Sequence, residues 1–230
     1  MAEPNILYIL ADDLGWADLS LHGSPIQTPN IDQLANEGVE LTQHYVCPMC
    51  TPTRASFLSG RHPSRFGPHA TTPSNAPVFP DGYPTLATAL RDSGYDTGLF
   101  GKWHLGYGND ERTDFTKPLT PGPLNLGFDY HFGVPQNHGD YVGAYVENDS
   151  IYGLRSDKQV PYSRSFYGKR YFGLDAPQRD NKQVMEDLTE KSVDWIRSVK
   201  QNEPFFLYFA PVAVHHPSTP SDDMRGASEA

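Results

Sequence analysis

The chain has 230 residues, of which 37% are hydrophobic, and a formal net charge of −10. That length can bury one hydrophobic core, and no apolar run is long enough to cross a bilayer. The excess of acidic residues argues against nucleic acid or an anionic membrane as a partner, but not against a small anionic substrate, because a metal ion and a few cations can reverse the local potential. No signal-peptide pattern is visible, which leaves the cellular compartment open.

The first elements in chain order are a strand and two helices. Residues 5–11 are continuously apolar, which predicts a strand buried on both faces of a parallel sheet. A helix is predicted from Thr28-Pro29, where threonine caps and proline suits the first turn, to Gly38. Residues 39–46 look extended, and residues 52–59 are predicted to be helical.

Further along, residues 83–94 predict a helix with a glycine stop, and residues 95–100 predict a strand. The segment 106–182 is rich in Gly, Pro, Tyr and Asn, so we expect long loops with little regular structure, which are usually functional or inserted. Residues 184–200 have the apolar stripe of an amphipathic helix, and residues 205–210 predict another strand. Residues 218–230 form a polar tail without a pattern.

The alternation of strands and helices predicts an α/β fold with a mainly parallel central sheet flanked by helices. Three of the predicted strands lead into chemically capable residues: Asp12-Asp13, Lys102 with His104, and His215-His216. In open α/β sheets, ligands bind beyond the carboxyl ends of the strands. We therefore expect these three segments to converge on one crevice.

The chain has two cysteines, Cys47 and Cys50, which are three positions apart. Two cysteines are too few for a disulfide scaffold. A C-x-x-C pair is also typical of redox and zinc sites, and His44 extends it to His-x-x-Cys-x-x-Cys. The Thr-Pro-Thr-Arg that follows Cys50 does not suit a thioredoxin-like frame, and zinc needs further ligands at set spacings. A redox or zinc site is therefore the least favoured interpretation.

The residues around Cys50 favour chemistry on an anion. Cys50 lies at or just before a helix N-terminus, where the dipole and free N–H groups favour negative charge, and Arg54 follows one turn later. Adjacent carboxylates such as Asp12 and Asp13 need a compensating positive charge after a buried strand, and Ca²⁺ provides one. Taken singly, each residue has a structural alternative: a capping aspartate, a packed cysteine or a surface cation.

The segment Cys50-Thr-Pro-Thr-Arg-Ala-Ser-Phe-Leu-Ser-Gly-Arg61 resembles the signature of the type I, arylsulfatase-like sulfatases of the alkaline phosphatase superfamily. Gly101-Lys-Trp-His-Leu-Gly106 and His215-His-Pro217 resemble two further motifs, in the family's order. The resemblance implies that residues 1–217 are the N-terminal part of a catalytic domain, incomplete at the C-terminus. Since the family takes further metal ligands and a lysine from beyond the third motif, we expect these 230 residues alone to bind metal weakly and turn over little.

The resemblance also implies cofactors and residue roles. Cys50 would become formylglycine (3-oxoalanine), the nucleophile, through a formylglycine-generating or an anaerobic sulfatase-maturing enzyme. Ca²⁺, with Mg²⁺ as an alternative, would bind Asp12, Asp13 and oxidised Cys50. The other implied catalytic roles are charge stabilisation by Arg54 and Lys102, proton transfer at the nucleophile by His104, and leaving-group protonation by His215. Lys102, His215 and Asn137 would also bind the substrate.

The implied reaction is hydrolysis of a sulfate ester on a sulfated small molecule or a sulfated sugar. Two alternatives stay open. One is a phosphate or phosphonate monoester hydrolase of the same superfamily, and the other is a non-catalytic fragment.

Overall fold

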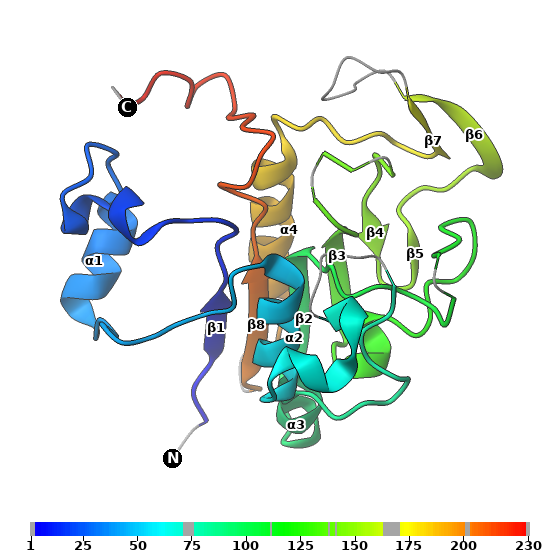
Figure 1. The fold of residues 1–230 in the computed structure, drawn as a ribbon, viewed down its shortest axis with the longest axis horizontal. Helices are drawn as coiled ribbons and strands as arrows, with labels where there is room; N and C mark the ends of the chain where they lie inside the picture. The colour runs from blue at the N-terminus through cyan, green and yellow to red at the C-terminus, as the bar shows by residue number, and fades with distance from the viewer. Residues whose placement is uncertain are drawn as a thin grey trace.

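The computed structural model describes residues 3–70, 76–110, 112–137, 139–140, 142–162, 171–200 and 203–228. A six-stranded sheet has the order β1 (Ile6–Ile9), β8 (Phe205–Ala210), β2 (Asp96–Lys102), β3 (Tyr130–Val134), β4 (Val146–Glu147), β5 (Ser150–Ile151) (Figure 1). The first four strands are parallel, and β4 and β5 are antiparallel. The predicted α/β class with a mainly parallel sheet is therefore confirmed.

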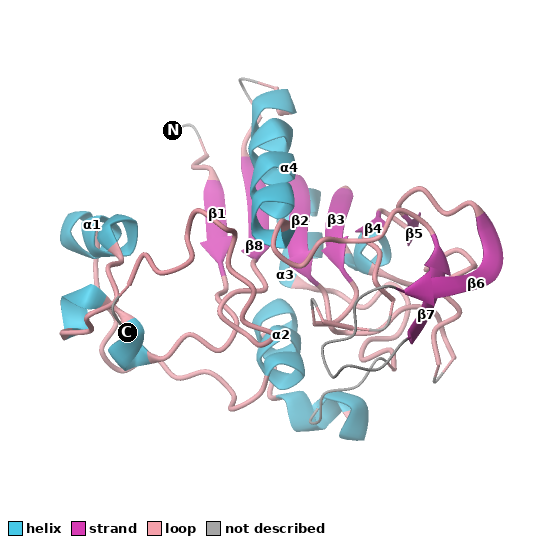
Figure 2. Cartoon of the chain, turned by 90° about the horizontal axis from the view of Figure 1, so that it is seen from above, coloured by secondary structure: helices cyan, strands magenta, loops and turns pink. Residues whose placement is uncertain are grey.

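Helices cover both faces of the sheet (Figure 2). The helix α4 (Val184–Ser198) packs on one face, where Val184 and Leu188 join Phe100 and Leu207 in a buried cluster. The helices α2 (Cys50–Ser59) and α3 (Leu86–Asp92) pack on the other face, in a cluster that includes Ala55, Leu58, Ala87, Leu99 and Tyr208. Neighbouring residues of β2 and of β8 thus belong to opposite faces, as strand geometry requires.

The predicted helices are present, with ends that differ by a few residues. The helix α1 spans Pro29–Glu37, and α2 begins at Cys50 rather than at residue 52. The helix α3 begins later than predicted because Thr85 caps it, its Oγ1 accepting a hydrogen bond from the Thr88 N–H. The helix α4 ends at Ser198.

The strand β1 corrects the expectation of burial on both faces. It lies at the edge of the sheet, and Leu7 and Ile9 are 52% and 55% exposed. Among the described residues, β8 is the one strand that pairs with it. A short apolar run cannot reveal this position, since it looks the same in a central strand and in an edge strand.

The expectation of little regular structure in residues 106–182 was wrong. This segment contains β3, β4 and β5 of the main sheet. It also contains β6 (Ser156–Tyr162) and β7 (Tyr171–Asp175), which pair in a separate antiparallel sheet. Gly133 makes β3 hard to recognise as a strand from the sequence. Glycine is nevertheless required at this position, because a Cβ on Gly133 would lie 1.8 Å from the Gly101 carbonyl oxygen.

A projecting segment connects β1 to α2. None of the residues of α1 is buried, and α1 stands apart from the sheet (Figure 1). Residues 39–46, which looked extended, contain no strand, and they expose Val39 and Leu41 by 84% and 69%. Residues 218–228 form turns without a helix or strand. No helix in the described ranges has the length and hydropathy needed to span a membrane.

Candidate active site

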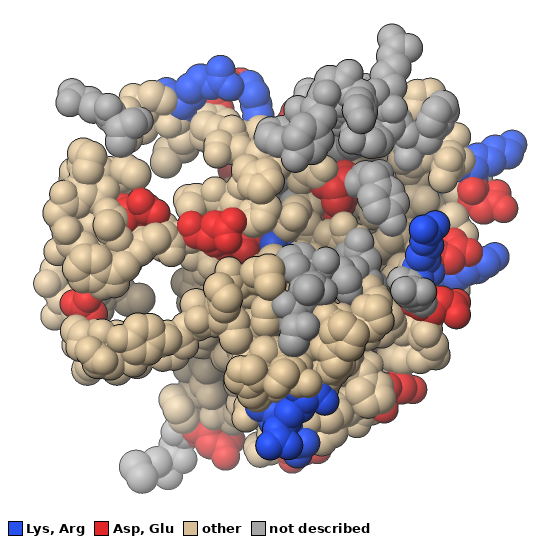
Figure 3. All heavy atoms as spheres, in the orientation of Figure 1, with Lys and Arg blue, Asp and Glu red and all other residues tan. Residues whose placement is uncertain are grey.

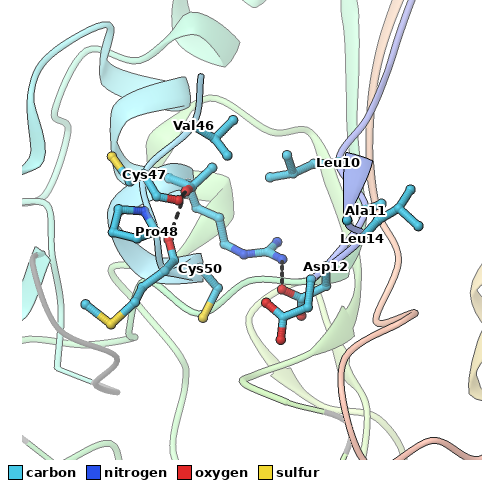
Figure 4. A pocket seen from close by; sticks show the side chains of 13 residues that line it. Leu10, Ala11, Asp12, Leu14, Val46, Cys47, Pro48 and Cys50 are labelled. Carbon is cyan, nitrogen blue, oxygen red and sulfur yellow. Dashed lines mark hydrogen bonds and ion pairs between the residues drawn. The ribbon is translucent and has the colours of Figure 1, made fainter. Parts of the chain in front are cut away.

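The carboxyl ends of β1, β2 and β8 bring the three predicted segments together. Beyond β1 and β8, Asp12 and Val214 form a further parallel bridge, with the Asp12 N–H donating to Ala213 O (2.9 Å) and the Val214 N–H donating to Asp12 O (2.7 Å). This bridge places Asp12 and Asp13 beside His215. The N-terminus of α2 supplies Cys50 and Arg54 to the same place, and a cavity of about 340 Å³ lies between it and the end of β1 (Figure 4).

One carboxylate lies between two buried cations in the wall of this cavity. Asp12 is 3% exposed, and its Oδ2 accepts from Lys102 Nζ at 2.6 Å while Oδ1 lies 3.5 Å from Arg54 Nη2. Arg54 also donates from Nη1 to Lys102 O at 2.7 Å. Burial lowers the pKa of Lys102, and the charge of Arg54 lowers it further, whereas Asp12 opposes both effects. With Lys102 protonated, the cluster has a surplus of positive charge, which suits an anion.

Cys50 and His104 are in contact. The Sγ atom of Cys50 lies 3.2 Å from Nδ1 of His104. Burial lowers the pKa of His104 to about 2, and the neighbouring charges of Lys102, Arg54 and His215 act in the same direction. The ring is therefore neutral at physiological pH, and with its proton on Nε2 it can accept a hydrogen bond at Nδ1 from a group at position 50.

His215 and Asp13 form a second, more open pair, with Nε2 of His215 3.6 Å from Oδ2 of Asp13. The Nδ1 atom of His215 donates to the His216 carbonyl oxygen at 2.6 Å, which leaves the Nε2 atom of His215 directed toward the site. His216 stacks on the His215 ring, with the two ring centroids 4.4 Å apart. The Asp13 side chain is 59% exposed, and its φ of 62° is in the left-handed region that aspartate tolerates.

Asn137 lies in the turn after β3, close to His104 in the backbone, since the His104 N–H donates to Pro135 O at 3.0 Å. Its buried Oδ1 has no hydrogen-bond partner in the part of the chain that the structure describes. Asn137 is not among the residues that line the 340 Å³ cavity, and neither are Lys102, His104 and His215. Those three are joined to Asp12, Cys50 and Asp13 by side-chain contacts, whereas the Asn137 segment meets the cluster through the hydrogen bond from the His104 N–H to Pro135 O.

The two cysteines face different partners. Cys47 Sγ lies 3.7 Å from Ser56 Oγ, whereas Cys50 points toward His104, and Figure 4 shows the two sulfur atoms on different sides of the segment. Both are free thiols. No three His, Cys, Asp or Glu side chains within the described ranges gather as a metal site, which holds for His44 with the two cysteines and for Asp12 and Asp13 with Cys50 alike.

The cavity offers donor atoms of the kind that a hard cation prefers, but it does not offer a full set of ligands. Asp12 and Asp13 offer carboxylate oxygens at the cavity wall, beside position 50. Calcium usually takes six to eight oxygen ligands. The two carboxylates supply part of that number.

Sequence reasoning missed Thr51. This residue is fully buried, and its Oγ1 donates to the carbonyl oxygen of His104 at 3.1 Å. No spacing rule identifies it, because the contact joins residues 53 positions apart in the sequence. The small polar residue directly after Cys50 was the one available signal.

Fold and site together define an α/β protein with a cysteine at a helix N-terminus and two buried cations near the carboxyl ends of parallel strands. The sulfatase family model matches residues 4–229, and the chain belongs to the sulfatase family.

Individual relatives agree with this assignment. The chain is 34% identical to N-acetylgalactosamine-6-O-sulfatase of Bacteroides thetaiotaomicron, across 98% of this chain and 51% of that protein. Human arylsulfatase D is 48% identical across 58% of this chain and 23% of that protein. A solved structure from work on glycosaminoglycan metabolism by Bacteroides thetaiotaomicron matches with a TM-score of 0.88 and 31% identity, over 99% of this chain and 54% of that one. The chain thus spans about half the length of these Bacteroides proteins.

The phosphonate monoester hydrolase of Agrobacterium radiobacter is a more distant neighbour. It matches with a TM-score of 0.55 and 21% identity, over 96% of this chain and 43% of that one. This likeness concerns the fold alone.

Proposed function

We propose that the protein hydrolyses sulfate esters and that Cys50, after oxidation to formylglycine, provides the nucleophile. The observation that carries the proposal is the position of Cys50. It is the first residue of α2, lies 3.2 Å from a neutral His104, and shares a cavity with Arg54. Membership of the sulfatase family supports the reaction class.

The buried cations would bind and orient the sulfate group. Arg54 and Lys102 are 1% and 0% exposed and share one carboxylate, so part of their charge is available to an anion in the cavity. Donors already fixed in a water-poor site need little reorganisation as negative charge develops in the transition state. Because Arg54 lines the cavity, the sulfate oxygens would lie against its guanidinium, and the buried Lys102 next to it would add to the positive potential.

The two histidines would handle protons. Nδ1 of His104 is in contact with position 50, so we propose that His104 is the group that handles the proton of the nucleophile there. His215 has Nδ1 engaged with the His216 carbonyl, which leaves Nε2 to carry a proton to the departing alcohol oxygen. Asn137, with its unpartnered side-chain oxygen, would contact the substrate beside His104.

The proposal requires one modification of the polypeptide, at Cys50, and one bound metal ion. Formylglycine supplies, in its hydrated form, an oxygen nucleophile, and a formylglycine-generating or anaerobic sulfatase-maturing enzyme would produce it. Ca²⁺, or Mg²⁺, held by Asp12, Asp13 and the oxygen at position 50, would polarise the oxygens bound to it. With part of a ligand set in these 230 residues, we propose weak metal binding and little turnover for this length of chain alone.

A sulfated sugar is the substrate class that the relatives favour. The Bacteroides relative is named as acting on N-acetylgalactosamine 6-O-sulfate groups, and a solved neighbour with 25% identity and a TM-score of 0.64 contains its substrate D-glucosamine-2-N,6-O-disulfate. We propose the same class here, with a sulfated small molecule as the alternative.

Peptide mass spectrometry across Cys50, on protein from the native host, tests the nucleophile. An aldehyde in place of the thiol is expected, and an intact thiol or a Cys47–Cys50 disulfide would contradict the proposal. The sulfate and phosphate esters of 4-nitrophenol, compared on the matured protein, test the reaction class. Faster release from the phosphate ester would favour the phosphate or phosphonate hydrolase instead.

A further inference from the structure

We propose that Thr51 is a positioning residue that holds His104 against residue 50. This inference rests on the proposed function, in which His104 exchanges a proton with the group at position 50. Thr51 is fully buried, and its hydroxyl donates to the His104 carbonyl oxygen at 3.1 Å. It is thus the covalent neighbour of one partner and the hydrogen-bond partner of the other.

The backbone of His104 needs such a restraint. Its φ is 57°, in the left-handed region that a residue with a Cβ rarely adopts. Two hydrogen bonds hold it there, one from its N–H to Pro135 O at 3.0 Å and one from Thr51 Oγ1 to its carbonyl oxygen at 3.1 Å. Without the second bond the backbone can relax toward a favoured φ, and the ring then moves away from Cys50.

The first turn of α2 meets the end of β2 at two carbonyl groups. Arg54 donates to Lys102 O at 2.7 Å, and Thr51 donates to His104 O at 3.1 Å. Arg54 also pairs with Asp12, so its replacement would disturb the charges of the cavity. Thr51 has no charge, and replacing its hydroxyl by a methyl group changes the geometry of His104 without changing the ionic cluster.

A buried threonine can also be merely structural, and the chain offers a matched control. Thr97, in β2, is equally buried, and its Oγ1 donates to the carbonyl oxygen of Gly127 at 2.7 Å. Like Thr51, it does not line the cavity. Thr97 Oγ1 also bonds to Asp129 Oδ2 at 2.8 Å and accepts from the Asp129 N–H at 3.0 Å. Thr97→Val therefore removes a hydrogen bond of the same kind, together with two others, from a site whose described contacts do not include Cys50 or His104.

The test is a double-mutant cycle on the reactivity of the Cys50 thiol. The full 230-residue chain carrying the thiol is treated with iodoacetamide between pH 6 and 9, and alkylation of Cys50 and Cys47 is followed by peptide mass spectrometry. The proteins are wild type, Thr51→Val, Thr51→Ser, His104→Ala, the Thr51→Val/His104→Ala double variant, and Thr97→Val. Circular dichroism checks that each is folded, and Thr51→Ala replaces Thr51→Val in the cycle if the valine variant does not fold.

A positioning role predicts a specific pattern. Thr51→Val should slow alkylation of Cys50 by about threefold or more, in the same direction as His104→Ala, because the thiol loses its imidazole partner. In the His104→Ala background Thr51→Val should have no further effect. Thr51→Ser, which keeps the hydroxyl, and Thr97→Val should both stay within about twofold of wild type, and the Cys47 rate should not change.

Two results would overturn the inference: a wild-type Cys50 rate in Thr51→Val, or an equal fold-change in both backgrounds of the cycle. The assay needs neither a sulfate ester nor a matured nucleophile. A failure of the proposed function, seen as an intact thiol in protein from the native host, would therefore be distinct from a failure of this inference.

Discussion

Asp12 and Asp13 are consecutive in the chain but have opposite environments. Asp12 is 3% exposed and is the counter-charge of Lys102 and Arg54, which are themselves buried, whereas the Asp13 side chain is 59% exposed and pairs with His215. A carboxylate between two buried cations is energetically coupled to both, while an exposed one is screened by water. The two residues therefore contribute to stability very differently.

Asp12→Asn should destabilise the fold by roughly 3 kcal/mol or more, because it leaves two buried cations without a counter-charge. Asp13→Asn should change stability by less than about 0.5 kcal/mol, since the side chain is exposed and asparagine tolerates the same φ of 62°. Urea unfolding at pH 7 measures both. Similar losses in the two variants would show that the Asp12 cluster does not carry this energy.

The buried His131 should make stability depend on pH. Its Nδ1 donates to Leu99 O at 3.2 Å and its Nε2 accepts from the Tyr107 hydroxyl at 3.3 Å. Burial lowers its pKa from 6.5 to about 4, so the unfolded chain takes up a proton that the folded chain refuses. This contribution is present above pH 6.5 and is lost as the pH falls toward 4.

Between pH 7 and 4.5, His131→Gln should therefore lose about 2 kcal/mol less of its free energy of unfolding than wild type does. Some loss should remain, because His104 also has a lowered pKa and contributes with the same sign. Urea unfolding of wild type and variant at several pH values gives the two slopes. Parallel slopes would mean that His131 is not the group responsible.

At this scale the sequence predicted which residue types gather but not how they pair. The motifs placed Asp12, Cys50, Lys102 and His104 near one another because each lies at or just beyond the end of a strand or opens a helix, and those ends share one edge of the sheet. The ion pair of Asp12 with Lys102 and the bond from Thr51 to His104 join residues more than 50 positions apart. Local patterns carry no information about such pairs.

Among the elements, the neighbouring strands β1 and β8 show how position in a sheet decides how much a side chain contributes to stability. Leu7 and Leu207 are partners in the register of these strands, yet Leu7 is 52% exposed and Leu207 is 1% exposed. The same residue type at the same level of the sheet thus buries very different areas. Hydrophobic stabilisation is roughly proportional to the buried area.

Leu207→Ala should cost about 2–5 kcal/mol, since it opens a cavity between the sheet and α4, whereas Leu7→Ala should cost less than about 1 kcal/mol. Guanidinium unfolding of the two variants provides the comparison. Equal losses would show that the outer face of β1 is covered in solution.

The elements that sequence analysis missed share a physical cause. The predicted strands are apolar runs, but β3 contains Gly133 against the Gly101 backbone, and β4 and β5 have two residues each. Such strands are defined by their partners rather than by their own composition. The same dependence explains why residues 39–46, which are half apolar and have no partner strand among the described residues, form no strand.

For the whole molecule, metal binding is the most direct test of how much of the site these 230 residues hold. We expect Ca²⁺ to bind with a Kd of about 1 mM or weaker, because two carboxylates are present and Asp12 is already paired with Lys102. Calorimetric titration with CaCl₂ measures this, with Asp13→Asn as the variant that should bind still less. Micromolar binding, or rapid turnover of 4-nitrophenyl sulfate by the same protein, would contradict the expectation.

The distribution of charge has a kinetic consequence. The chain has a net charge of −10, and on the face shown in Figure 3 its Lys and Arg side chains lie mostly near the margin, while the cations of the cluster are buried beside Asp12. An anion diffusing in from solution is therefore repelled over the Debye length, about 10 Å at 0.1 M salt, before it meets attraction inside the cavity. Added salt screens the repulsion more than the buried attraction. The encounter of an anionic ligand with this protein should accordingly become faster as ionic strength rises, the reverse of the usual electrostatic steering.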